Sequence, residues 1–198
     1  MAQSNVYSLN IVGYVNYTQP AGTFKLVGNP LNQTNNDVSS VFTTGPTYPG
    51  LTVYKRNASN TGFDSASFDP DLAAWNGPLD VSPGTGLIVA SPGGVTFSNT
   101  FIGEVVLNST NALAGGFNLK ASVVPQQGLI QTDLLAPSTP GDVVYLQNSA
   151  GTGFDTYSFD PDLAAWTPSE PTIPVAKGFY YFNGGIAKSW IRHFSVGP

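Results

Sequence analysis

A fifteen-residue stretch occurs twice in this chain, and it constrains the fold more than any other feature. Residues 61–75 read TGFDSASFDPDLAAW and residues 152–166 read TGFDTYSFDPDLAAW, so thirteen of the fifteen positions are identical. The similarity extends upstream, where LTVYKRN (51–57) aligns with DVVYLQN (142–148). The repeat period is roughly 91–93 residues and covers nearly the whole chain, which predicts two copies of one supersecondary unit.

The middle of the chain resembles both of its ends. TFSNTFIGEV (96–105) is similar to the C-terminal SWIRHFSVGP, and its second half is similar to LNIVGYV (9–15). We therefore expect one strand to end the first copy and begin the second, with the N-terminal strand beside the C-terminal one, because such closure removes exposed sheet edges. The predicted bounds are a single domain over 1–198, with repeat one over about 9–105 and repeat two over about 101–198, sharing the strand near 101–105.

The composition indicates short strands joined by many turns. Charged residues make up only 10% of the chain, whereas it contains 22 glycines and 16 prolines. Apolar and β-branched runs are short and are bounded by Gly, Pro, Asn and Ser, as strands are. The segment VYKRN-ASNTG-FDSASF has the pattern of a hairpin closed by Gly62. The sequence predicts an all-β fold, a β-sandwich or barrel-like domain of two intertwined repeats with pseudo-two-fold symmetry.

The repeated FDPDLAAW is the one segment with a helical pattern. Asp69 is a good N-cap residue, Pro70 suits the first helical position and Asp71 complements the helix dipole. We therefore predict one short helical turn per repeat. Trp75 and its counterpart Trp166 are predicted to be structural residues that fold this turn onto the sheet.

The same stretch offers candidate calcium ligands. Calcium prefers several oxygen ligands, carboxylates among them. The spacing differs from that of an EF-hand loop, so helix capping is the alternative role for these carboxylates. Calcium is the only cofactor that the sequence suggests, and the candidate ligands are three aspartates in each copy: Asp64, Asp69, Asp71, Asp155, Asp160 and Asp162.

Aromatic side chains are candidates for stacking on a ligand. Phe, Trp and Tyr form 12% of the chain, and the run 179–182 (FYYF) replaces the aliphatic LIVA of the first copy. Strand alternation sends two of these four side chains outward. Tyr180, Tyr181 and Trp190 are the candidate stacking residues, and burial in the core is the alternative.

Catalytic and nucleic-acid-binding patterns are weak or missing in the sequence. His193 is the only histidine and no G-x-S-x-G motif occurs, so we expect no enzyme of the serine-hydrolase type. Glu104 and Glu170 are the glutamates that a glycosidase could pair with an aspartate. With a net charge of −5 and only 7 Lys and Arg, the chain lacks the basic patch of a nucleic-acid binder. No apolar run has the length of a membrane span, and the absence of cysteine excludes disulfides.

The opening NVYSLNIVGYVN, the following AGTFKLVGNPLN and the VYKRN…GF…W unit resemble a group of uncharacterised secreted bacterial two-repeat proteins. The resemblance implies export and an all-β fold, but no activity and no site residues. AQS after the initial Met would fit the start of a mature secreted chain. We therefore expect a secreted, non-catalytic structural or adhesive protein at the cell surface, which assembles with itself. The alternative is a carbohydrate-binding module that recognises an extracellular glycan through exposed Trp and Tyr, supported by calcium; a hydrolase ranks third.

Overall fold

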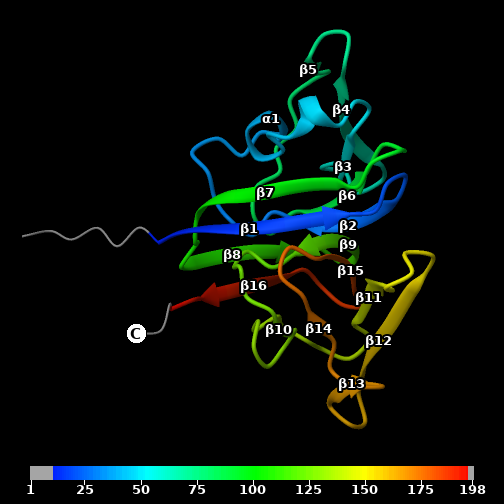
Figure 1. Cartoon of the computed structure of the whole chain (residues 1–198). Helices are drawn as coiled ribbons and strands as arrows, with labels where there is room; N and C mark the ends of the chain where they lie inside the picture. The colour runs from blue at the N-terminus through cyan, green and yellow to red at the C-terminus, as the bar shows by residue number, and fades with distance from the viewer. Residues whose placement is uncertain (1–10, 196–198) are drawn as a thin grey trace, which may run out of the picture.

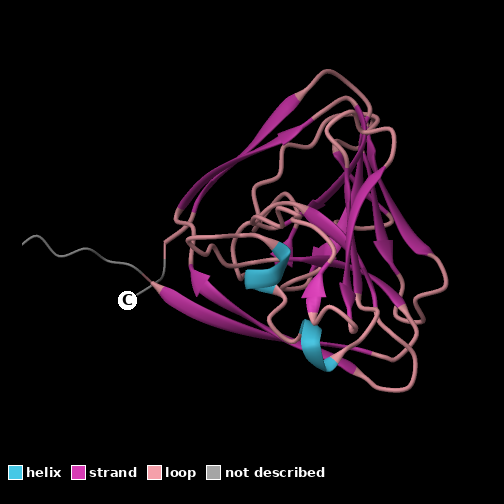
Figure 2. Ribbon diagram, turned by 90° about the horizontal axis from the view of Figure 1, so that it is seen from above, coloured by secondary structure: helices cyan, strands magenta, loops and turns pink. Residues whose placement is uncertain are grey.

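The computed structural model describes residues 11–195 and confirms an all-β fold with two similar halves, one above the other in Figure 1. The start of the predicted N-terminal strand at residue 9, the chain's opening and the last three residues lie outside the described part. Loops and short strands dominate, and the described residues form only two short helical segments (Figure 2).

The first half runs from β1 to β7. Its elements are β1 (Val12–Gln19), β2 (Phe24–Gly28), α1 (Val38–Val41), the 3-10 turn η1 (Gly45–Thr47), β3 (Thr52–Arg56), β4 (Phe63–Asp69), β5 (Ala74–Trp75), β6 (Gly86–Ala90) and β7 (Phe97–Glu104). Five of these strands form one sheet in the order β2-β6-β3-β4-β5, and β1 pairs with β7 in a separate ribbon. The core of this half is one cluster, which also takes in Ala176 from the second half.

The second half repeats this plan. Its strands are β8 (Asn108–Leu113), β9 (Gly116–Ala121), β10 (Gly128–Leu129), β11 (Val143–Gln147), β12 (Phe154–Asp160), β13 (Ala165–Thr167), β14 (Thr172–Ile173), β15 (Gly178–Asn183) and β16 (Lys188–His193). The five-stranded sheet has the order β13-β12-β11-β15-β9, and β16 pairs with β8. A short β10–β14 pair stands in the region where the first half has α1.

The prediction of a shared middle strand is wrong. β7 pairs along its whole length with β1 of its own half, from Gln19 opposite Phe97 to Val12 opposite Glu104. β8 then begins a new strand and pairs with the C-terminal β16. Each half therefore has its own two-stranded ribbon. β7 ends at Glu104, and β8 begins at Asn108 as a strand of a second antiparallel pair. The five-stranded sheets remain open, and the described strands form no closed barrel.

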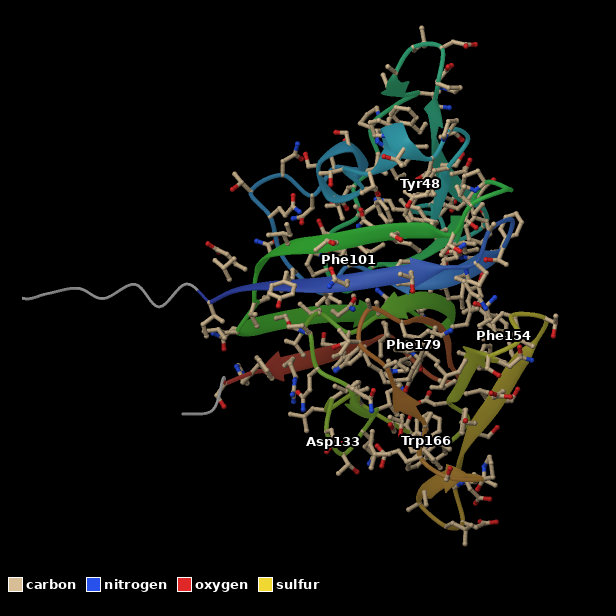
Figure 3. The ribbon with its side chains drawn as sticks, viewed as in Figure 1. Tyr48, Phe101, Asp133, Phe154, Trp166 and Phe179 are labelled. Carbon is tan, nitrogen blue, oxygen red and sulfur yellow. The ribbon has the colours of Figure 1, made fainter. Side chains whose placement is uncertain are left out.

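Each half has its own hydrophobic core between its sheet and its ribbon. In the first half Phe97 and Phe101 of β7 are fully buried and pack with Phe42, whose ring centroid lies 5.7 Å from that of Phe101. In the second half Phe179 of β15 packs with Trp190 of β16, with ring centroids 6.2 Å apart. Alternation along the strands explains the burial of Phe101 and Phe179, which are labelled in Figure 3.

The halves meet where the β2–β6 edge of one sheet crosses the β9–β15 edge of the other, and glycines permit the close approach. A Cβ atom added at Gly86 would lie 2.6 Å from the backbone nitrogen of Lys120, and one at Gly178 would lie 2.7 Å from the carbonyl oxygen of Val27. Gly86 and Gly178 are counterparts in the aligned repeats. Only glycine fits at such a contact between backbones.

The contacts between the halves are reciprocal. One isolated bridge joins Val27 to Lys177, and another joins Thr85 to Lys120. In the repeat alignment Val27 is the counterpart of Lys120, and Thr85 is the counterpart of Lys177. The two bridges therefore join the same pair of positions in opposite senses, which is the relation that a pseudo-two-fold axis between the halves produces.

Each half also covers the edge strand of the other. The side-chain amide of Gln147 donates to the carbonyl oxygen of Phe24 on β2 at 2.8 Å. The side-chain amide of Asn60 donates to the carbonyl oxygen of Phe117 on β9, the counterpart of Phe24. We call these two contacts the reciprocal clasp. They satisfy edge groups that would otherwise be open to pairing with another chain.

The predicted helical turn in each repeat is wrong, because FDPDLAAW forms a hairpin turn. Asp69 is opposite Ala74 in the β4–β5 pair, and the residues between them make a turn. The carboxylate of Asp69 accepts the N–H of Asp71 at 2.9 Å, as an N-cap would. Ala73 then takes a positive φ of 49°, which reverses the chain instead of continuing a helix. The described α-helix is α1, capped by Asp37, in the first half.

Candidate binding site

Four aromatic side chains form an open hollow on the outer face of the second sheet. Strand alternation places Phe179 and Tyr181 in the core, so Tyr180 between them faces outward. The hollow has a volume of about 220 Å³, and we call it the aromatic cup; its lining is Phe117 of β9, Tyr145 of β11, Phe154 of β12 and Tyr180 of β15. Phe117 is 46% exposed and Phe154 is 47% exposed, so the rings are open to solvent.

The rings of the cup stand at angles to one another. Phe154 meets Tyr180 with ring centroids 5.9 Å apart and an interplanar angle of 68°. Phe117 meets Tyr145 at 5.8 Å and 36°, and its other side meets Phe182 at 5.0 Å and 63°. Such tilted and edge-to-face pairs are the favoured aromatic geometries. The result is a concave apolar surface and not a flat stacking platform.

A positive charge lies beside the cup and comes from the other half. Arg56 at the end of β3 donates from Nε to the side-chain oxygen of Asn60 at 2.7 Å, and from Nη2 to its backbone carbonyl. Asn60 in turn donates to the backbone carbonyl of Phe117, which lines the cup. Burial raises the pKa of Tyr180, and the positive charge of Arg56 acts against that rise. The guanidinium is thus fixed near an otherwise apolar hollow.

The first half has no matching fourth wall. The counterparts of Phe117, Tyr145 and Phe154 are Phe24, Tyr54 and Phe63, so three aromatic positions are retained. The counterparts of Tyr180 and Phe182, however, are Ile88 and Ala90. The guanidinium of Arg56 lies 5.4 Å from the centroid of the Phe63 ring. The two sheets therefore present different outer faces despite their common origin in a repeat.

Two of the three predicted stacking residues are buried, and that part of the prediction is wrong. Tyr181 is fully buried, and its hydroxyl donates to a carboxylate oxygen of Asp142 at 2.7 Å. Trp190 is 4% exposed, and its indole N–H donates to the carbonyl oxygen of Leu134 at 2.7 Å. Both side chains lie on the core face of their strands. Tyr180 is the one that faces outward, in the aromatic cup.

The six aspartates considered for calcium do not come together. Among residues 11–195, no group of three or more His, Asp or Glu side chains could hold a metal ion. Asp69 and Asp160 instead accept backbone N–H groups of their own turns. Asp71 and Asp162 are exposed within those turns. Asp64 and Asp155 are exposed on strands β4 and β12. Three carboxylates close in sequence are separated here because strand alternation and chain reversal point them in different directions.

The repeated tryptophans have different surroundings. Trp166 is 6% exposed, and its N–H donates to the side chain of Gln131 at 3.1 Å. Trp75 is half-buried and packs edge-on against Phe68 at 5.9 Å. It also borders a hollow of about 720 Å³ with Asp37 and Ser39 in its lining. Trp75 is therefore accessible from this hollow, whereas Trp166 is not exposed in the same way.

The residues considered for catalysis are Glu104, Glu170 and His193, and each of them contacts a different part of the fold. Glu170 accepts the backbone N–H groups of Gln131 and Thr132, at 2.5 and 2.7 Å, and so anchors the segment that follows β10. Glu104 ends β7 and exchanges backbone hydrogen bonds with Asn32. His193 is exposed, and its Nδ1 lies 2.7 Å from the side-chain oxygen of Asn108 on the paired strand β8.

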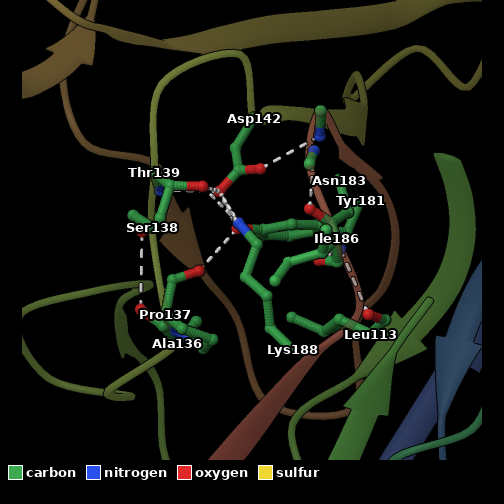
Figure 4. A network of polar contacts seen from close by, with 12 residues as sticks. Leu113, Ala136, Pro137, Ser138, Thr139, Asp142, Tyr181, Asn183, Ile186 and Lys188 are labelled. Atoms are coloured by element: carbon green, nitrogen blue, oxygen red, sulfur yellow. Dashed lines mark hydrogen bonds and ion pairs between the residues drawn. The ribbon is translucent and has the colours of Figure 1, made fainter. Parts of the chain in front are cut away.

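A buried ion pair in the second half was not anticipated from the sequence. Asp142 has no exposed surface, and its carboxylate contacts the ammonium group of Lys188 (Figure 4). It also accepts from the backbone N–H of Thr139 at 2.7 Å and that of Gly184 at 3.2 Å. Burial, then the hydrogen bond and the charge of Asp142, raise the pKa of Tyr181, which keeps its proton as a donor. These donors compensate the buried charge of Asp142 within the fold.

Sequence reasoning missed the aromatic cup because its members lie on four strands. The alternation of β15 predicts that Tyr180 faces outward, but only when the burial of Phe179 shows which face of the strand is inward. Arg56 could not have been placed, because it belongs to the other half. None of the described helices is long and apolar enough to cross a bilayer. Comparison with family models, with curated proteins and with solved structures returned no match to the chain.

Proposed function

We propose that this chain is a secreted, non-catalytic structural or adhesive subunit that associates with further copies of itself through the aromatic cup. The observation that carries the proposal is the group of four solvent-open aromatic rings on one sheet face. Aromatic side chains are enriched in protein interfaces, and exposed apolar patches mark interaction sites. The tilted rings make a receptacle for an apolar side chain. Secretion is proposed from the low charge content and from the family resemblance of the opening segments.

A second function is favoured by one specific feature, the hollow beside Trp75. Small-molecule sites are concave and mostly apolar, with a few polar groups that fix orientation. The hollow combines the half-buried indole with the polar side chains of Asp37 and Ser39. On this alternative the protein is a carbohydrate-binding module that stacks a sugar ring on Trp75. Binding to a glycan panel that is lost in Trp75→Ala and kept in Phe117→Ser would establish it.

The test of self-association is molar mass by light scattering over a concentration series. We expect the mass to rise above the 20.8 kDa of one chain as concentration increases. Phe117→Ser should hold the protein at the monomer mass, because it removes a wall of the aromatic cup. Phe24→Ser is the matched control, since Phe24 is the exposed counterpart in the first half and lies outside the cup. A parent protein that stays monomeric throughout, or an equal effect of both variants, would contradict the proposal.

A further inference from the structure

The tips of the β4–β5 and β12–β13 hairpins are identical in sequence and exposed. Residues 70–73 and 161–164 both read Pro-Asp-Leu-Ala, and we call them the acidic tips. They lie at opposite ends of the molecule, beyond β4–β5 and β12–β13 (Figure 1). Leu72 is 71% exposed and Leu163 is 69% exposed. Each molecule therefore presents the same small surface twice.

The fold accounts for most of each tip but not for its leucine. Asp69 and Asp160 are needed as acceptors for the turn, and Ala73 and Ala164 share a φ of 49°. The leucine contributes its backbone N–H, which any residue but proline would supply. An exposed leucine has no core to fill, so packing does not require it at either tip.

Outside the repeated stretch 61–75 and 152–166, the two halves differ even at positions that face solvent. The outward positions of β6 are Ile88 and Ala90, and those of β15 are Tyr180 and Phe182. Against this divergence, the identity of the exposed tips indicates a common contact. A surface that occurs twice on one molecule, in the same conformation, will bind the same partner twice.

The acidic tips and the aromatic cup match in chemistry. A tip offers one aliphatic side chain with the carboxylate of Asp71 or Asp162 next to it in the chain. The cup offers an apolar hollow, and the guanidinium of Arg56 is joined to its wall through Asn60, which bonds both Arg56 and the backbone carbonyl of Phe117. An apolar knob entering an aromatic hollow buries apolar surface, and opposite charges at its border align the two surfaces.

We propose that the occupant of the aromatic cup is an acidic tip of another copy of this chain. Leu72 or Leu163 enters the hollow, and the neighbouring Asp71 or Asp162 faces Arg56. The inference rests on the proposed self-association and names the surface that the cup binds. Because tip and cup are different surfaces, the contact is heterologous and leaves a free cup or tip on every added copy. Two tips for one cup also allow branching.

The experiment uses two full-length variants that cannot associate with themselves. The double variant Leu72→Ser/Leu163→Ser keeps its cup and loses both knobs, and Phe117→Ser keeps both tips and loses the cup. Each should stay monomeric alone by light scattering. Mixed together, they should form complexes of at most one Phe117→Ser chain with two chains of the tip variant. The association should weaken as salt is raised, because the Asp–Arg contact is screened.

The outcomes separate this inference from the proposed function. If the parent associates, Phe117→Ser abolishes association and the tip variant still associates like the parent, the cup binds another copy by a different surface and the tip assignment is overturned. If the parent never associates, self-association itself fails. If both variants are monomeric but do not complement each other, the contact does not join tip to cup, and the inference is again overturned. Serine at exposed leucines leaves the fold intact, which a circular dichroism melt of the tip variant will check.

Discussion

At the scale of single residues, the clearest difference between the halves is the buried charge of the second core. Asp142 and Tyr181 occupy positions whose counterparts in the first half are Leu51 and Val89, both fully buried. One copy thus fills this region with aliphatic side chains, and the other fills it with a carboxylate, a phenol and the ammonium of Lys188. A buried charge is tolerated only when it is paired and hydrogen-bonded, so these groups depend on one another.

Replacing Lys188 should expose that dependence. Lys188→Met leaves the carboxylate of Asp142 without its counter-charge, and we expect the free energy of unfolding to fall by about 3 kcal/mol. Chemical denaturation measures the loss, and the double variant Asp142→Asn/Lys188→Met should recover part of it. Lys55→Met is the matched control, because its pair with Asp80 spans 3.3 Å at the surface; its expected cost is below about 1 kcal/mol. Equal losses for the two single variants would contradict this account.

At the scale of elements, helix α1 shows how one carboxylate organises a short helix. Asp37 accepts the N–H of Ser39 at 3.0 Å and its hydroxyl at 2.7 Å, and also the N–H of Leu79 at 2.9 Å. Burial alone would raise the pKa of Asp37, but these hydrogen bonds outweigh it and hold that pKa below its usual value. The charged form is therefore favoured in the folded protein.

The acid dependence of stability should follow from this cap. Because the folded pKa of Asp37 lies below the unfolded one, its contribution is complete above an unfolded pKa of about 3.9 and is lost as the pH falls through the folded pKa. Asp37→Asn should flatten the fall in melting temperature below about pH 4, and Asp37→Ala should cost about 1 kcal/mol at neutral pH. Asp155→Asn, at an exposed strand position, is the control. If the melting temperature of Asp37→Asn falls with acid as steeply as that of the parent, the Asp37 cap does not cause the acid dependence.

The elements also show what the sequence can and cannot predict. The strands around Val53, Phe154 and Phe179 follow from their apolar and β-branched runs, and the structure has strands there. The turn at Asp69 was misassigned because Asp-Pro-Asp suits the first turn of a helix and a hairpin equally well. Pairing of Phe68 with Trp75 across the hairpin decides the outcome, and such a contact outweighs local helix propensity. The aromatic cup needs the phase of four strands at once, which no single segment specifies.

At the scale of the whole molecule, the two halves form one unit through contacts between backbones. Gly86 and Gly178 let the sheets approach, and the reciprocal clasp ties each edge strand to the opposite half. The pairing that separates the halves, β1 with β7 and β8 with β16, makes each of them self-contained in its strands. Cooperativity between the halves therefore depends on this crossing and on Ala176 of the second half, which packs in the core of the first.

Adding methyl groups at the crossing should uncouple the halves. In Gly86→Ala/Gly178→Ala the new Cβ atoms would meet backbone at less than 3 Å, so we expect a loss of about 3 kcal/mol in the free energy of unfolding. Calorimetry should show one transition in the parent and two in the variant. Gly93→Ala is the control, because nothing lies within 4 Å of its added Cβ. A single transition with unchanged midpoint in the double variant would rule this out.

The reciprocity of the contacts between the halves has a consequence for a chain of half the length. Two copies of such a chain would supply each other's bridges and clasp, so the same contacts would make a symmetric homodimer. In such a dimer any change is made twice, and each cup comes with a tip. Within one chain the two halves can differ, and β15 has Tyr180 and Phe182 where β6 has Ile88 and Ala90. The single chain therefore carries the aromatic cup on one half only, whereas both halves carry an acidic tip.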